Sequence, residues 1–121
     1  MYIFVNTDLK MSFGQTVAQV AHIVQVITEE IVRESYEIVP VPQYCLTYMK
    51  WSKVCTKVVL GATNKQILEL MKMDEARHFI DDIYYSNGSY KDTVTQEVTV
   101  VGFFPSATNR DYFNKFRLLT P

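Results

Sequence analysis

The fold of this chain follows from one stretch near its start, Thr7-Asp8-Leu9-Lys10-Met11-Ser12-Phe13-Gly14-Gln15-Thr16-Val17-Ala18-Gln19-Val20-Ala21-His22. Ser12 and Gln15 have the spacing of a capping box, in which the serine hydroxyl accepts from the Gln15 N–H and the glutamine amide reaches back. This pair predicts that a long helix begins after Ser12. The β-favouring run at residues 2–6 predicts a strand just before it.

The predicted helix carries two different sides. Apolar residues recur three and four positions apart and indicate a face packed on a sheet: Val17, Val20, Ala21, Val24, Ile27 and Ile31. Gln15, Gln19 and His22 stand at i, i+4 and i+7, so they stack along one side of the first two turns. A polar stripe beside a strand-to-helix turn is where an α/β protein usually places a ligand.

Further elements follow in an alternating order. Prolines at 40 and 42 end the first helix near residue 35 or 36, because proline disfavours helix in itself and in the residue before it. Thr63 and Gln66 form a second capping-box spacing, which predicts another helix. We expect further strands at 54–62, 77–85 and 97–104, a turn at 86–90, a short final helix from 105–106 to about 114, and either a short helix or a loop at 43–52. This order implies a mixed sheet with helices on both faces.

Composition limits the class of protein. A length of 121 residues with 48% hydrophobic residues fits one domain spanning 1–121. No run approaches ~20 apolar residues, so we expect no membrane span. Cys45 and Cys55 are too few for a disulfide scaffold or a zinc site, which favours a reduced, cytoplasmic setting. The net charge of −1 argues against a generally basic nucleic-acid binder, although twelve Lys and Arg residues can still gather on one face.

The opening stretch resembles the first motif of the type 2 peptidyl-tRNA hydrolases, D-L-K-M-G-K-G-K-x-A-A-Q-C-x-H. Three later segments are similar to that family in the right order: the run Lys57-Val58-Val59-Leu60, the run Thr99-Val100-Val101-Gly102-Phe103-Phe104-Pro105 and the close Lys115-Phe116-Arg117-Leu118-Leu119. The resemblance covers nearly the whole chain. It implies a three-layer α/β/α sandwich around a four-stranded mixed β-sheet, in agreement with the element order.

The same resemblance implies an activity. Family members hydrolyse the ester that joins a peptide to the terminal ribose of tRNA, and this reaction needs a positioned water, a proton acceptor and donors for the oxyanion. Peptidyl-tRNA is the implied partner, and no metal or organic cofactor is implied. A homodimer is compatible with the resemblance, since family members commonly pair.

Several family positions are retained in this chain. The glutamine and histidine of the opening motif fall on Gln19 and His22, and the threonine of the last strand falls on Thr99. Asp8, Lys10 and Gly14 match the turn before the helix, where backbone N–H groups and a lysine suit the binding of substrate phosphate.

Other family positions are changed. The catalytic lysine falls on Gln15, and the first lysine of the motif falls on Phe13. A gap-free alignment of the family's D-A-G-[RK]-T-Q loop places its aspartate on Asn87 and its threonine on Lys91. Replacing a Lys–Asp pair by a Gln–Asn pair leaves neither charge unpaired, as expected where catalysis is lost and packing is kept. Our hypothesis is that Lys91 replaces the missing lysine, while Gln19 and Thr99 hold water.

Each candidate also has a structural interpretation. His22 can be a half-buried structural histidine, Gln15 the cap partner of Ser12, and Thr99 an ordinary strand residue. Three functions therefore remain open: a peptidyl-tRNA esterase, a catalytically degenerate module that still binds tRNA, and a protein-binding domain of the same fold. Retention of the polar residues at the strand-to-helix turn favours the esterase.

Overall fold

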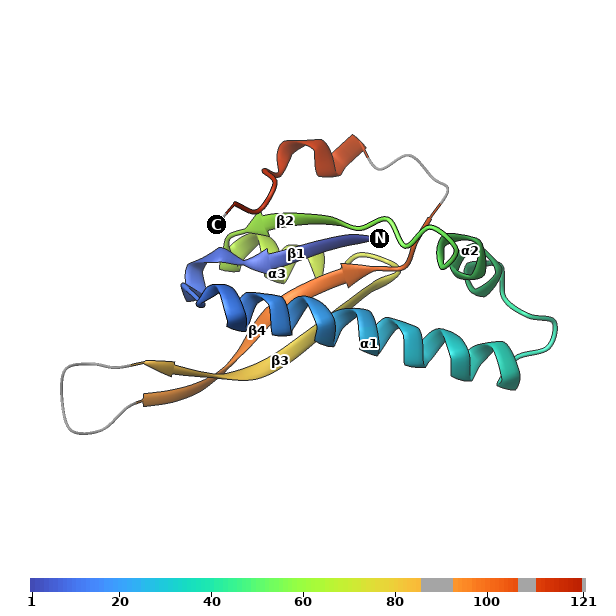
Figure 1. Cartoon of the computed structure of the whole chain (residues 1–121), viewed down its shortest axis with the longest axis horizontal. Helices are drawn as coiled ribbons and strands as arrows, with labels where there is room; N and C mark the ends of the chain where they lie inside the picture. The colour runs from blue at the N-terminus through green and yellow to red at the C-terminus, as the bar shows by residue number, and fades with distance from the viewer. Residues whose placement is uncertain (86–92, 107–110, 121) are drawn as a thin grey trace.

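The four strands form one mixed sheet. The computed structural model describes residues 1–85, 93–106 and 111–120, apart from the side chains of residues 84, 85 and 93. The sheet order is β2-β1-β4-β3, with strands β1 (Tyr2–Asn6), β2 (Val58–Ala62), β3 (Ala76–Tyr85) and β4 (Thr93–Phe103). β1 pairs parallel with β2 and antiparallel with β4, and β3 pairs antiparallel with β4. Figure 1 shows β3 and β4 running past the end of the other two strands as a two-stranded ribbon.

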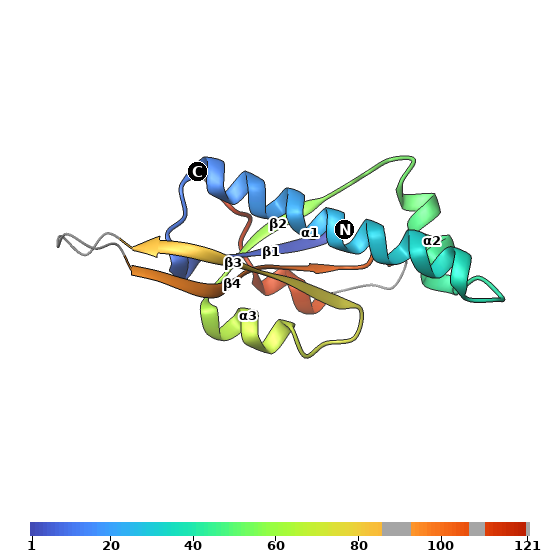
Figure 2. The same cartoon turned by 90° about the horizontal axis from the view of Figure 1, so that it is seen from below.

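Helices cover both faces of this sheet (Figure 2). α1 (Phe13–Glu37) and α2 (Gln43–Trp51) pack on one face, and α3 (Asn64–Leu70) packs on the other with the 3₁₀ helix η2 (Asp111–Lys115). A second 3₁₀ helix, η1 (Thr7–Leu9), joins β1 to α1. The three-layer α/β/α arrangement predicted from the sequence is confirmed.

Two apolar clusters fill the spaces between the layers. The cluster under α1 and α2 contains the alternate β1 residues Ile3 and Val5, together with Val100 of β4. The cluster under α3 and η2 is built around Phe4, whose ring meets those of Phe103, Phe113 and Phe116 edge to face. Residues buried on both faces explain why β1 reads as an unbroken apolar run.

The buried line of α1 differs from the predicted face. Ile23, Ile27 and Ile31 are buried at i, i+4 and i+8, and Gln19 continues the same line one turn earlier. The buried side of α1 is therefore rotated about the helix axis relative to the predicted apolar face. Val17 is 51% exposed, although the sequence placed it in the core. Ile27 and Ile31 are the two predicted face residues that the core buries fully.

Both predicted capping boxes are present, at Ser12 with Gln15 and at Thr63 with Gln66. Three boundaries differ from the predictions. β2 begins at Val58 instead of 54, because the chain after α2 first makes a turn in which Cys55 adopts a φ of 56°. β4 begins at Thr93 instead of 97, because its pairing with β3 continues to the end of the described ribbon.

The third difference concerns the final helix. The predicted start at 105–106 is not helical, and the observed element is the 3₁₀ helix η2, separated from Ser106 by residues outside the description. The ambiguous segment 43–52 is the helix α2, which ends at Trp51. The predicted turn at 86–90 lies outside the described residues. None of the described helices has the length and apolar character needed to span a membrane.

Candidate functional site

Gln19 stands at the centre of a buried hydrogen-bonded group beneath the first turns of α1. Its Nε2 donates to Oδ2 of Asp81 at 2.8 Å, and its Oε1 accepts from the hydroxyl of Thr99 at 2.6 Å. Gln19 is 5% exposed and Thr99 is fully buried. Because each end of the amide has its own partner, the network fixes the orientation of the Gln19 side chain.

A β-bulge in β4 aims Thr99 at this group. Phe79 pairs with Val100 and Ile80 with Val98, so Thr99 is an extra residue in the ladder. Without the bulge, Thr99 and Val100 would point to opposite faces of the sheet. With it, both point toward α1: Val100 packs in the core cluster beneath that helix, and Thr99 reaches Gln19.

Asp81 supplies the carboxylate of the site. It lies in β3 on the same face as Phe79, and its Oδ1 accepts from the backbone N–H of Asp82 at 2.8 Å. The hydrogen bond from Gln19, followed by that from Asp82, lowers the pKa of Asp81 below its ordinary value of 3.8, and proximity to His22 acts in the same direction. Asp81 is therefore ionised at neutral pH.

His22 borders the same group from the third turn of α1. Its ring lies against the ring of Phe79, with 4.7 Å between the centroids and 30° between the planes. The stacking fixes one face of the imidazole while the residue remains half-buried. A histidine held this way beside a carboxylate can act as a proton acceptor.

Gln15 forms the predicted capping box, and its catalytic role stays a prediction. Its Oε1 accepts from the backbone N–H of Ser12 at 2.8 Å, and its own N–H donates to the Ser12 hydroxyl at 3.2 Å. The side chain also borders the cavity above Asp81. The amide nitrogen of Gln15 is the donor of this side chain, and it can donate to a ligand while the oxygen stays in the cap.

These residues enclose a small polar cavity of about 320 Å³. It confirms that Gln15, Gln19 and His22 share one side of the helix. The full lining is Met11, Gln15, Ala18, Gln19, His22, Asp81, Asp82 and Ile83. Among the described residues, no lysine or arginine lines this cavity. No group of three metal-ligating side chains occurs within the described ranges either.

The three residues predicted to contact substrate near the turn lie elsewhere. The Asp8 carboxylate accepts from the backbone N–H of Asn64 at 2.7 Å, which ties η1 to the start of α3. Lys10 is exposed in a left-handed turn with φ of 50°, and Gly14 is exposed in the first turn of α1. Asp8 thus has a structural contact, and the substrate contacts of all three residues stay predictions.

Asn87 and Lys91, the two remaining candidates, lie outside the described residues. The carboxylate found beside Gln19 is Asp81, which the sequence interpretation missed because it followed a gap-free alignment into the loop. A signal was available in the run Phe79-Ile80-Asp81-Asp82-Ile83, where two acids interrupt an apolar strand. Acids in a strand that packs under a helix call for a partner, since a buried unpaired charge is costly.

One comparison with known proteins returned a match, to a protein family. A family model described as peptidyl-tRNA hydrolase PTH2 matches residues 1–119. A search of curated proteins returned no significant match. The matched range includes every residue of the polar cavity.

Proposed function

Because the chain belongs to the peptidyl-tRNA hydrolase PTH2 family, we propose that it hydrolyses the ester bond of peptidyl-tRNA in the cytoplasm, releasing free tRNA and peptide. The main observation behind the proposal is the network that joins Asp81, Gln19 and Thr99, because Asp81 and Gln19 also line the polar cavity beside α1. Gln19 and Thr99 are buried, and the hydrogen bonds that join them to Asp81 hold the group in one geometry, which suits the positioning of a water molecule.

In the proposed reaction the water lies between Asp81 and His22. The ionised Asp81 accepts one hydrogen bond from the water and orients its lone pair toward the ester carbonyl. His22 takes a proton as the water oxygen bonds to the carbonyl carbon. The amide nitrogen of Gln15 donates to the oxyanion. The bond to the ribose oxygen then breaks, and that oxygen receives the proton from His22.

A non-catalytic module that binds tRNA is the second candidate. Gln15 stands where the family motif has a lysine, and its amide oxygen accepts from the Ser12 N–H in the capping box. In the described part of the chain, no lysine or arginine borders the cavity. A neutral amide stabilises an oxyanion less well than an ammonium group does. The earlier hypothesis that Lys91 supplies this charge stays a prediction.

The test uses purified protein, peptidyl-tRNA and a measurement of released tRNA, alongside tRNA binding at several salt concentrations. We expect turnover by the wild type and a loss of at least about a hundredfold in Asp81→Asn, by analogy with removal of a single transition-state contact. Asp74→Asn is the matched control, because Asp74 is exposed in the connection between α3 and β3.

Three outcomes separate the candidates. Turnover that Asp81→Asn removes and Asp74→Asn keeps supports the esterase. Binding that weakens steeply with salt, without turnover, supports the non-catalytic module instead. Absence of both turnover and binding contradicts both proposals and favours a protein-binding domain. Lys91→Ala is assayed in parallel, and undiminished turnover in it would exclude the role proposed for Lys91.

A further inference from the structure

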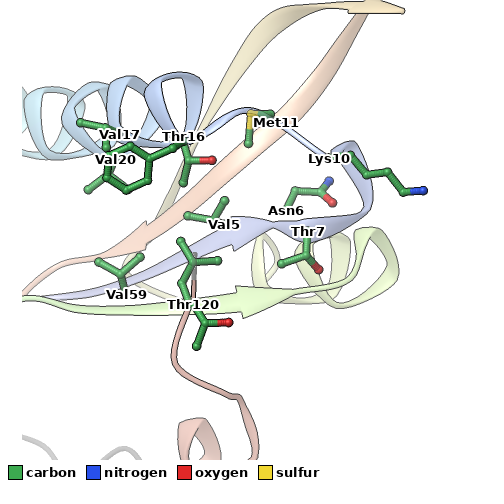
Figure 3. A pocket seen from close by; sticks show the side chains of 12 residues that line it. Val5, Asn6, Thr7, Lys10, Met11, Thr16, Val17, Val20, Val59 and Thr120 are labelled. Atoms are coloured by element: carbon green, nitrogen blue, oxygen red, sulfur yellow. The ribbon is translucent and has the colours of Figure 1, made fainter.

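An apolar groove lies on the other side of the α1 N-terminus (Figure 3). Its volume is about 620 Å³, within the range of small-ligand sites. Valine side chains from three elements form its walls: Val5 from β1, Val17 and Val20 from α1, and Val59 from β2. Leu119 of the C-terminal segment closes the groove. The backbone N–H of Leu119 donates to the Val59 carbonyl at 3.0 Å.

The groove leaves apolar surface of α1 uncovered. Phe13 is 77% exposed and Val17 is 51% exposed, and both border the groove. Large apolar side chains gathered around a concavity gain free energy when a ligand removes them from water. Phe13 also stands where the family motif has a lysine, so this chain has an apolar rim at a position where the family motif is cationic.

Met11 connects the groove to the polar site. It borders both the groove and the cavity that holds Gln19 and Asp81. A ligand that passes over Met11 therefore has one part among polar groups and the other among valines.

Charge decides which part of a peptidyl-tRNA belongs in the groove. Lys10 is the only charged residue in the described lining, and Figure 3 shows its amino group pointing away from the labelled valines. Nucleic acid is held by several cations along its phosphates, whereas a peptide side chain needs only apolar surface. The groove chemistry fits the acyl part of the substrate.

We propose that this groove binds the peptide side of the substrate and favours a large apolar residue at the ester end. The inference rests on the proposed function, since it takes the ester to lie in the polar cavity. It adds a specificity: the enzyme distinguishes substrates by the residue esterified to tRNA.

The probe is a non-hydrolysable analogue, adenosine joined through an amide at its ribose to N-acetylphenylalanine, with the N-acetylglycine analogue for comparison. Binding is followed by NMR in protein labelled at valine and leucine methyl groups and at glutamine side-chain amides. We expect the methyl signals of Val17, Val59 and Leu119 to shift together with the Gln19 amide. We also expect the phenylalanine analogue to bind about tenfold more tightly than the glycine analogue.

Two aspartate variants of α1 test the location. Val17→Asp places a charge in the groove and should abolish the preference for phenylalanine. Val32→Asp is the matched control, because Val32 is 49% exposed on the same helix and does not border the groove. It should keep the tenfold preference. A circular dichroism spectrum for each variant verifies that the helix is intact.

The results separate this inference from the proposed function. Shifts of the Gln19 amide without shifts of the groove methyls would overturn the inference and leave the esterase proposal standing. Equal loss of preference in both aspartate variants would also overturn it. The protein could also fail to hydrolyse peptidyl-tRNA and still show shifted NMR signals of the groove methyl groups and tighter binding of the phenylalanine analogue. That result would support an acyl-binding groove and contradict the esterase.

Discussion

Gln19 is the residue on which the geometry of the site depends. Its amide connects a carboxylate on β3 to a hydroxyl on β4, across sequence separations of 62 and 80 residues. Reversing the amide would bring its NH₂ group against the Thr99 hydroxyl and its oxygen against the Asp81 carboxylate. The second contact is repulsive, so the network permits one orientation.

Replacing Thr99 by valine tests this network. Thr99→Val keeps the shape and removes the hydroxyl, which leaves the buried Oε1 of Gln19 without its donor. We expect a loss of about 1–3 kcal/mol in the free energy of unfolding, measured by urea denaturation. Thr99→Ser retains the hydroxyl and should lose only about 0.5–1.5 kcal/mol for the missing methyl group. A valine variant as stable as the wild type would contradict the importance of this hydrogen bond.

Asp81 predicts a pH dependence of stability. Its pKa is lowered in the folded protein, so the stability it contributes is present above the ordinary value of 3.8 and is lost as the pH falls through the lower folded value. Asp81→Asn lacks this titration. The difference in melting temperature between wild type and variant should be largest at neutral pH and shrink below about pH 4. A difference that stays constant down to pH 2 would show that the carboxylate charge is not involved.

At the scale of elements, the contact of α1 with β4 determines how close the helix approaches the sheet. A Cβ built on Gly102 would lie 2.7 Å from Cγ1 of Ile23 and 3.0 Å from Cδ1 of Ile27. The absence of a side chain at Gly102 therefore lets the buried isoleucines of α1 touch the strand. The same approach brings Gln19, one turn earlier, within hydrogen-bonding distance of Thr99.

Two glycine-to-alanine variants test this contact. Gly102→Ala should destabilise the protein by about 1–3 kcal/mol, because the isoleucines or the helix must move. Gly14→Ala should stabilise it by about 0.4–1 kcal/mol, since nothing lies within 4 Å of the added atom and α1 is already helical there. Thermal unfolding of both variants gives the comparison. Equal effects would mean that the contact is not tight.

At the scale of the whole molecule, the C-terminal segment protects the edge of the sheet. β2 is an edge strand, and Leu118 forms an antiparallel bridge to Leu60 beside it. The N–H of Gly61 donates to the carbonyl of Arg117 at 3.0 Å. The segment thus occupies hydrogen-bonding groups of β2 that would otherwise be open to another chain.

Removing residues 117–121 should therefore destabilise the protein and promote association. We expect a lower melting temperature, because the packing of Leu119 is lost. We also expect a concentration-dependent increase in light scattering, because the edge of β2 becomes open to another chain. Leu118→Ala is the control, since this side chain is 67% exposed and the backbone bridge remains. A truncated chain with the same stability and the same association state as the intact chain would contradict this role. Sedimentation of the intact chain in the same series tests the homodimer.

Several local features of this protein were predictable from short-range sequence patterns. The starts of α1 and α3 were predictable from Ser12 with Gln15 and from Thr63 with Gln66, because a capping box joins residues three positions apart. The strand-helix order then restricted the sheet to a mixed one with helices on both faces. The polar side of α1 was predictable for the same reason, since helical spacing places Gln15, Gln19 and His22 together.

The strand residues that meet that polar side could not be predicted in this way, because they come together through long-range strand pairing. Strict alternation along β4 would turn either Thr99 or Val100 away from α1, and the bulge turns both toward it. The partner carboxylate is Asp81, because the register of β3 against β4 carries it beneath Gln19. Such contacts depend on how strands far apart in the chain align, and no short-range pattern encodes that alignment.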